Sequence, residues 1–263
     1  SITFEEVEDI GFYNNTHQEG SLQFTNNGAL KLENIDNHGI YGVTNANATF
    51  EFINNDEIFV DSTRLACIST YGNNGTTLFT NNAAIDVQGC GEHGLVLYGR
   101  QDTVAYPVTI NFKNYGDFAI KNTNYDGILF DSARGILTAE NFGNIDISDT
   151  GRRGILNYNR GSILTETNLF NFTNSGTIDI ENTLEHAWQN YTYRNSIIDI
   201  VNDGDINIKH SKQRGIFNQS DYTESETFFT NNGTINIDTV AQEGLINYTC
   251  LLYTSPSPRD TLL

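Results

Sequence analysis

The sequence contains no methionine, one tryptophan, three prolines and three cysteines among its 263 residues. It also has no long apolar run, which excludes a membrane span in these residues. Positive charge is scarce, because 14 Lys and Arg stand against 33 Asp and Glu, for a formal net charge of −19. Such a surface would repel nucleic-acid phosphates, so nucleic acid is excluded as a partner.

Sequence motifs for phosphate binding, triad catalysis and zinc binding are missing as well. No Gly-rich phosphate loop follows a strand pattern, no Ser/His/Asp set has a recognisable context, and no cysteines are paired at zinc spacing. We therefore predict no metal or cofactor from motifs.

What the sequence does contain is one pattern repeated eight times. The first seventeen positions of each unit keep a strict spacing, and successive units begin 27 to 33 residues apart. Apolar residues stand six and eight positions after the leading residue, as Ile178 and Ile180 do in one unit. The leading residues are Phe24, Phe52, Phe79, Phe112, Ala139, Phe172, Ile200 and Phe229.

The pattern predicts three short strands in each unit. The alternating apolar pair marks the first strand, a small residue followed by an apolar one begins the second, and segments such as Val108–Phe112 form the third. Strands with one apolar face each can bury those faces by coiling into a prism. We predict an all-β, right-handed parallel β-helix with three strands per rung, about eight full rungs and a partial rung in residues 1–23.

An asparagine stands two positions after every leading residue, and a glycine follows two positions later in six of the eight units. We expect the asparagines to form a structural ladder through their side-chain amides. We expect the glycines to supply a positive φ at a bend. The ladder residues are Asn26, Asn54, Asn81, Asn114, Asn141, Asn174, Asn202 and Asn231.

Two cysteines and three histidines fall at defined positions of the repeat. Equivalent positions of successive units form a column when the units stack. Cys67 and Cys90 occupy different columns of neighbouring units, several residues apart, so we expect two small buried side chains and no disulfide. His38, His93 and His186 share one column, which we interpret as an exposed turn. Stacking would separate them by about 10 Å or more, too far to share a metal.

The domain prediction is a β-helix over residues 1–249 and a separate tail over 250–263. The tail string CLLYTSPSPRD resembles the translation of a transposase-type sequencing-library adapter. We expect it to be no part of the natural protein, and the β-helix to be an internal fragment of a longer repeat array from an environmental sequence. A Pro-rich linker to a further domain is the alternative.

Two groups of residues are candidates for a functional site. Outward carboxylates of the predicted first strands, Asp146, Asp179 and Glu181, could hold Ca²⁺ or act as acid and base, although a solvated acidic face is the simpler interpretation. Two units carry about five extra residues, at 99–107 and 158–168, and aromatic and arginine side chains gather there. Such side chains suit sugar or peptide recognition. The binding candidates are Arg100, Tyr106, Arg134, Arg153, Tyr158 and Arg160.

The units, best seen in FTNNGTINIDTVAQEGLINY (229–248) and FTNSGTIDIENT (172–183), resemble repeats of secreted bacterial adhesin-like and autotransporter-like β-helices. The resemblance implies an extracellular or cell-surface scaffold without enzymatic activity, which binds a surface glycan or a host or partner protein. It also implies a parent protein that is anchored to the cell surface. The alternative is the β-helix body of a polysaccharide lyase or glycoside hydrolase, including phage tail-spike types.

Overall fold

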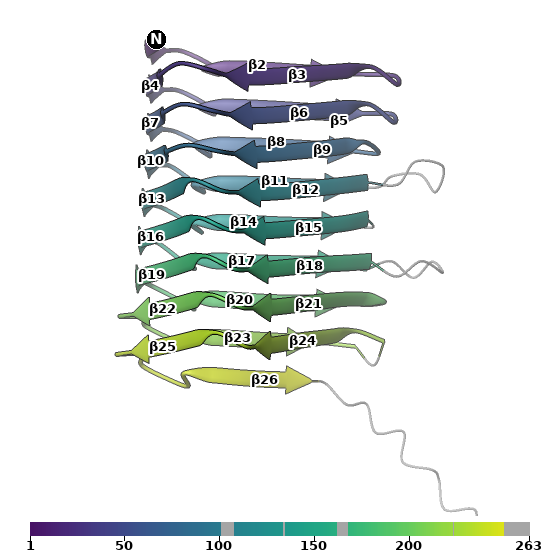
Figure 1. Cartoon of the computed structure of the whole chain (residues 1–263), viewed down its shortest axis with the longest axis vertical. Helices are drawn as coiled ribbons and strands as arrows, with labels where there is room; N and C mark the ends of the chain where they lie inside the picture. The colour runs from purple at the N-terminus through teal and green to yellow at the C-terminus, as the bar shows by residue number, and fades with distance from the viewer. Residues whose placement is uncertain (101–107, 134, 162–167, 223, 250–263) are drawn as a thin grey trace, which may run out of the picture.

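The structure, a computed structural model, describes residues 1–100, 108–133, 135–161, 168–222 and 224–249. These residues form three parallel sheets that run the length of a rod, with the strands stacked one above another (Figure 1). No helix among them is long and apolar enough to cross a membrane. The chain is an all-β parallel solenoid with three strands per rung, as the sequence predicts.

The three sheets are called A, B and C, and every third strand belongs to the same sheet. Sheet A contains β1 (Ile2–Val7), β4 (Leu30–Ile35), β7 (Ile58–Thr63), β10 (Ile85–Cys90), β13 (Asp117–Thr123), β16 (Asn144–Thr150), β19 (Thr177–Thr183), β22 (Asp205–Lys209) and β25 (Thr234–Asp238). Sheet B contains β2 (Phe12–Thr16), β5 (Ile40–Asn45), β8 (Ile68–Asn73), β11 (Leu95–Arg100), β14 (Ile128–Ala133), β17 (Ile155–Arg160), β20 (Trp188–Tyr193), β23 (Ile216–Ser220) and β26 (Leu245–Thr249). Sheet C contains β3 (Ser21–Asn26), β6 (Thr49–Asn54), β9 (Thr76–Asn81), β12 (Val108–Asn114), β15 (Gly135–Asn141), β18 (Asn168–Asn174), β21 (Ser196–Asn202) and β24 (Glu226–Asn231).

Equivalent positions of successive units lie directly beside one another. Ile145 pairs with Ile178, and Asn141 pairs with Asn174, so the register of the sheets is the register of the sequence repeat. In Figure 1 the chain runs left along the front strands (β3, β6, β9) and right along the rear strands (β2, β5, β8) as it descends, which is a right-handed coil. The right-handed coil predicted from the sequence agrees with the direction of the chain in Figure 1.

The inward columns form one continuous apolar core along the rod. Phe24, Phe52, Phe79 and Phe112 stack with ring centroids 4.6 to 5.5 Å apart. The stack is interrupted where a unit begins with alanine, and there Phe130 from sheet B packs edge-on against Phe112 at 5.6 Å. The core therefore keeps its volume at that rung through a neighbouring column.

The asparagine column forms the predicted ladder. Each buried Asn donates from Nδ2 to Oδ1 of the Asn one rung later, at 2.7 to 2.9 Å in all seven steps from Asn26 to Asn231. A second interior ladder joins Asn157, Asn190 and Asn218 to Asn247, with each step at 2.6 Å. These amides satisfy buried polar groups that a bend would otherwise leave without partners.

The predicted role of the repeat glycines is wrong, because none of those that follow the ladder asparagines has a positive φ. They are required for close approach instead. A Cβ at Gly143 would overlap the carbonyl oxygen of Gly116, and one at Gly176 would overlap that of Gly143. In these rungs the backbone of one rung lies directly against the backbone of the next, and a side chain at the glycine would overlap it.

Positive φ occurs at a different column, near the end of every sheet A strand. The nine residues there have φ between 53° and 63°, and strand pairing skips them in each rung, as between Lys121↔Ser148 and Thr123↔Thr150. Asparagine, aspartate, glycine and histidine fill most of this column, and these are the types that tolerate left-handed backbone. We call it the left-handed column: Glu6, Asn34, Ser62, Gly89, Asn122, Asp149, Asn182, His210 and Thr239.

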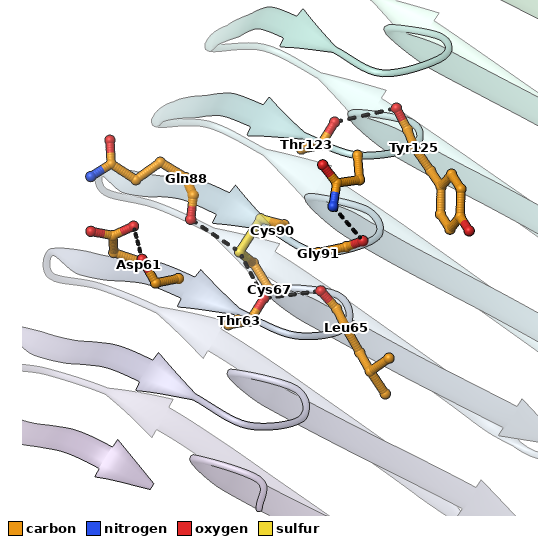
Figure 2. Close-up of a disulfide and its surroundings, with 11 residues drawn as sticks. Asp61, Thr63, Leu65, Cys67, Gln88, Cys90, Gly91, Thr123 and Tyr125 are labelled. Atoms are coloured by element: carbon orange, nitrogen blue, oxygen red, sulfur yellow. Dashed lines mark hydrogen bonds between the residues drawn. A yellow bond between two sulfur atoms is a disulfide. The ribbon is translucent and has the colours of Figure 1, made fainter. Parts of the chain in front are cut away.

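Cys67 and Cys90 form a disulfide, so the expectation that they stay apart is wrong. Figure 2 shows the two residues at the corner where sheet A turns into sheet B. Cys90 ends β10, and Cys67 lies just before β8, in the turn of the preceding rung. The chain bends between the two columns, which brings their Cα atoms to 5.4 Å, within the range that a disulfide needs. Both side chains are buried, as expected.

Candidate functional site

Asp146 and Asp179 face outward from sheet A and are paired neighbours in its register. Asp179 accepts a hydrogen bond from Nδ2 of Asn207 at 2.7 Å. Partial burial raises the pKa of Asp146, with smaller upward effects from Asp179 and Glu181, and Lys121 opposes them. The structure therefore places two of the three predicted carboxylates side by side.

Glu181 lies apart from that pair in the register, opposite Ser148 and Lys209. Its Oε1 contacts Nδ1 of His210 at 3.2 Å. Among the residues that the structure describes, no group of three or more His, Cys, Asp or Glu side chains is arranged to hold a metal ion.

Of the predicted binding residues, Tyr106 and Arg134 lie outside the described residues. Arg100 is exposed at the end of β11, whereas Tyr158 and Arg160 lie on β17. Arg160 forms two hydrogen bonds to Asp131 of the preceding rung, at 2.6 and 3.0 Å. Its guanidinium also lies 5.0 Å from the ring centroid of Tyr158 and 5.6 Å from that of Tyr98. This side chain is therefore held within the protein by its own neighbours.

Asp131 is the buried partner in this contact. Burial raises the pKa of its carboxyl to about 6, against the opposing effect of the Arg160 charge and its hydrogen bonds. Tyr98 and Tyr158 lie on either side of Asp131 in the register of sheet B, and the Asp131 side chain is 10% exposed. The cluster is consistent with a packed and charge-balanced element on the outer face of sheet B.

Arg153 is also engaged inside the protein. Its side chain is only 11% exposed, and it contacts Asp126 at 3.4 Å and Glu185 at 3.1 Å. Arg153 and Tyr158 line one small hollow of about 290 Å³. The structure thus brings Arg153, Tyr158 and Arg160 to the same side of the rod, but both arginines are already paired with carboxylates.

The column predicted as an exposed turn is only partly exposed. His186 is 7% exposed and packs against Phe217 with ring centroids 4.9 Å apart, so the expectation is wrong for this residue. Burial, together with the charges of Arg214 and Arg153, lowers the pKa of His186 to about 4. His38, in the same column, stacks on Tyr41 of sheet B with ring centroids 4.7 Å apart.

A larger hollow runs along the corner between sheets A and B, and we call it the corner groove. It has a volume of about 960 Å³ and crosses five consecutive rungs, from β13 to β25. Its lining residues are Asn122, Thr123, Asn124, Asp149, Thr150, Gly151, Glu181, Asn182, Thr183, Leu184, His210, Ser211, Lys212, Thr239, Val240 and Ala241. Glu181 is the one predicted site residue among them.

The groove is built from the same positions of each rung. Exposed side chains of the left-handed column, such as Asn122 and Asn182, form one wall, and small buried residues that follow them form the floor. Asn182 donates to Oδ1 of Asp149 at 3.0 Å. A left-handed residue in every strand turns the chain sharply, and the stacked turns produce a continuous furrow.

The floor carries one hydroxyl in each of four rungs. Thr123 donates to the carbonyl of Tyr125 at 3.3 Å, and Thr183 donates to Ser211 at 3.0 Å. Thr150, between them in the stack, is 2% exposed, and its hydroxyl has no partner among the described residues. This buried hydroxyl lies beneath the second of the five rungs that the groove crosses.

Sequence reasoning missed the corner groove. Its residues are ordinary polar types, and the usable signal was the run of Asn, Asp, Gly and His at the tenth position after each leading residue. That run predicts left-handed backbone, and left-handed backbone at one place in every rung predicts a furrow.

The fold and the groove define this chain as a three-sided parallel β-solenoid with a polar corner groove. Comparisons with protein-family models, curated proteins and solved structures returned no match for this chain.

Proposed function

We propose that this chain is a non-enzymatic scaffold that binds carbohydrate and works outside the cytoplasm. The observation that carries the proposal is the corner groove, which presents hydrogen-bonding side chains at the same position of five consecutive rungs. Side-chain amides, hydroxyls and carboxylates of this kind can exchange hydrogen bonds with a ligand rich in hydroxyl groups. A surface or adhesion role follows from a rigid rod that displays such a groove.

Binding without cleavage is favoured by where the carboxylates lie. Glycoside cleavage needs an acid and a base on either side of the bond to be broken. Asp146 and Asp179 face outward from sheet A and are not among the residues that line the groove. The groove carboxylates, Asp149 and Glu181, are each in contact with a neighbouring side chain.

A location outside the cytoplasm is supported by the disulfide between Cys67 and Cys90. Disulfides persist in oxidising compartments and are rare in the cytosol, where thiols are kept reduced. The acidic surface and the resemblance of the repeats to secreted adhesin-like solenoids point the same way. We propose a secreted or cell-surface protein.

The experiment is a binding and turnover screen with the full chain. Immobilised neutral and acidic polysaccharides are tested for retention of the protein, and the same polysaccharides in solution are tested for new reducing ends. We expect retention without new ends, and unchanged retention by the double variant Asp146→Asn, Asp179→Asn. New reducing ends that disappear in the double variant would establish the enzyme alternative instead, and retention by none of the polysaccharides would overturn carbohydrate binding.

A further inference from the structure

We infer that the ligand of the corner groove is a linear, uncharged polysaccharide that lies along the rod axis with one sugar at each rung. This inference rests on the proposed function and adds the class, direction and register of the ligand. It follows from three features of the groove: its period, its surface chemistry and its charge.

The period comes from the stacking of the strands. Because β13, β16, β19, β22 and β25 are paired in register, the groove repeats once per strand, at about 4.8 Å. An extended linear glycan advances by close to that distance per sugar. An extended peptide advances by about 3.3 Å per residue and would lose register within two rungs. The groove therefore matches a glycan better than a peptide.

The surface chemistry combines hydroxyl partners with apolar contacts. Asn122, Asn182 and Thr239 offer amide and hydroxyl groups along one wall. Leu184 is 48% exposed and lies on the other side of the groove, as does Ala241 further along. A sugar has apolar C–H faces and a rim of hydroxyl groups, so both kinds of contact are used when each ring lies against one rung.

The charge around the groove opposes an anionic ligand. Asp149 and Glu181 line it, Asp146 and Asp179 lie on the adjoining sheet, and the whole chain carries −19. His210 and Lys212 are the basic residues of the lining, and His210 is in contact with Glu181. A polymer of uronic acids or a sulfated glycan would be repelled at the rungs of Asp149 and Glu181.

The test is a length series measured by titration calorimetry on the full chain. Neutral oligosaccharides of two to eight sugars are cut from whichever neutral polysaccharide the screen retains. We expect affinity to rise with each sugar up to about five, the number of rungs that the groove crosses, and then to level off. A uronic-acid series of matched length should bind at least about tenfold more weakly.

Two matched variants locate the ligand. Leu184→Ala removes an exposed side chain from the groove, and Ile136→Ala removes one of nearly equal exposure, 47%, from the outer face of sheet C. We expect about tenfold weaker binding for the first and no change for the second.

The outcomes separate the inference from the proposed function. Affinity that levels off near five sugars and falls with Leu184→Ala supports the inference. Affinity that is independent of length, equal for uronic acids, or lost with Tyr158→Ala rather than Leu184→Ala overturns it and leaves carbohydrate binding in place. If no polysaccharide is retained in the screen, carbohydrate binding itself is overturned, and the inference about the ligand is overturned with it.

Discussion

Asn141 donates its side-chain amide to Oδ1 of Asn174 at 2.8 Å, inside the rod and between two rungs whose leading residues are 33 residues apart in sequence. The same Nδ2 also approaches the carbonyl of Gly143 at 3.1 Å. One side-chain amide thus joins two rungs and also donates a hydrogen bond to a backbone carbonyl in the bend of its own rung. This explains why asparagine occurs at this position in every unit.

Replacement of one ladder residue should destabilise the rod well beyond the loss of a surface bond. Asn174→Ala leaves buried groups on both neighbouring rungs without partners, and we expect a loss of about 1–3 kcal/mol in the free energy of unfolding. Urea denaturation followed by circular dichroism measures this. The control is Asn236→Ala, which removes an exposed bond of the same kind to Asn207 and should change the free energy by less than about 0.5 kcal/mol. Equal losses in the two variants would show that the ladder has no special role.

The disulfide should be found by peptide mapping without reduction, as a linked pair of peptides that contain Cys67 and Cys90. Loss of the cross-link in the double variant Cys67→Gly, Cys90→Thr, which restores the residue types of the other rungs, should cost about 2–4 kcal/mol. Addition of a reductant should lower the urea midpoint of the parent protein and leave that of the variant unchanged. Unlinked peptides in protein purified under oxidising conditions would contradict the assignment.

A larger side chain should destabilise the rod both at a repeat glycine and at a left-handed position, but for different reasons. Gly176→Ala forces a Cβ against the carbonyl of Gly143 and should destabilise the rod by about 1–3 kcal/mol. Asn182 has a φ of 56°, and Asn182→Val should lower the free energy of unfolding by about 1–2 kcal/mol because valine is β-branched. Asn182→Gly should be nearly neutral. Thermal and urea unfolding of the three variants checks this. A tolerated Gly176→Ala would contradict the close approach of the rungs.

Stability should decrease as the pH falls from about 6.5 to 4, because the pKa of His186 is lowered to about 4 in the folded state. Between those values the unfolded chain binds a proton that the folded chain does not, so stability rises with pH across the window. His186→Phe removes the titrating ring and keeps an aromatic contact with Phe217, so this variant should lose part of the pH dependence. A parallel pH profile for parent and variant would rule out His186 as the source.

The titration of Asp131, which is paired with Arg160, should change stability with pH in the opposite direction from that of His186. The folded pKa of Asp131 is raised to about 6, so its contribution to stability declines as the pH rises through 6. Arg160→Leu leaves the carboxylate without its partner and should cost about 1–3 kcal/mol at pH 8, after allowance for the partial exposure of Arg160.

The loss in Arg160→Leu should shrink toward pH 5, where Asp131 takes up a proton. The double variant Asp131→Asn, Arg160→Leu serves as the control, because it has no carboxyl to titrate. A loss that stays the same at pH 5 and pH 8 would show that packing rather than charge explains the effect.

The repeat itself was sufficient to predict the solenoid, its three strands per rung and its asparagine ladder. In a solenoid each unit contacts its neighbours in register, so a column in the alignment of the units becomes a column in space, as Asn141 and Asn174 show. Predictions of which residues stack on one another were therefore confirmed, because stacking needs only one column.

Relationships between columns were decided by the tertiary structure, because they depend on how sharply the chain turns at each corner. Cys67 and Cys90 look distant along the repeat, yet the turn from sheet A to sheet B brings them together. The corner groove exists for the same reason, since a left-handed residue such as Asn182 makes a furrow only when turns stack above and below it. The sequence by itself determined which residues share a column, and only the folded corners decided which columns meet.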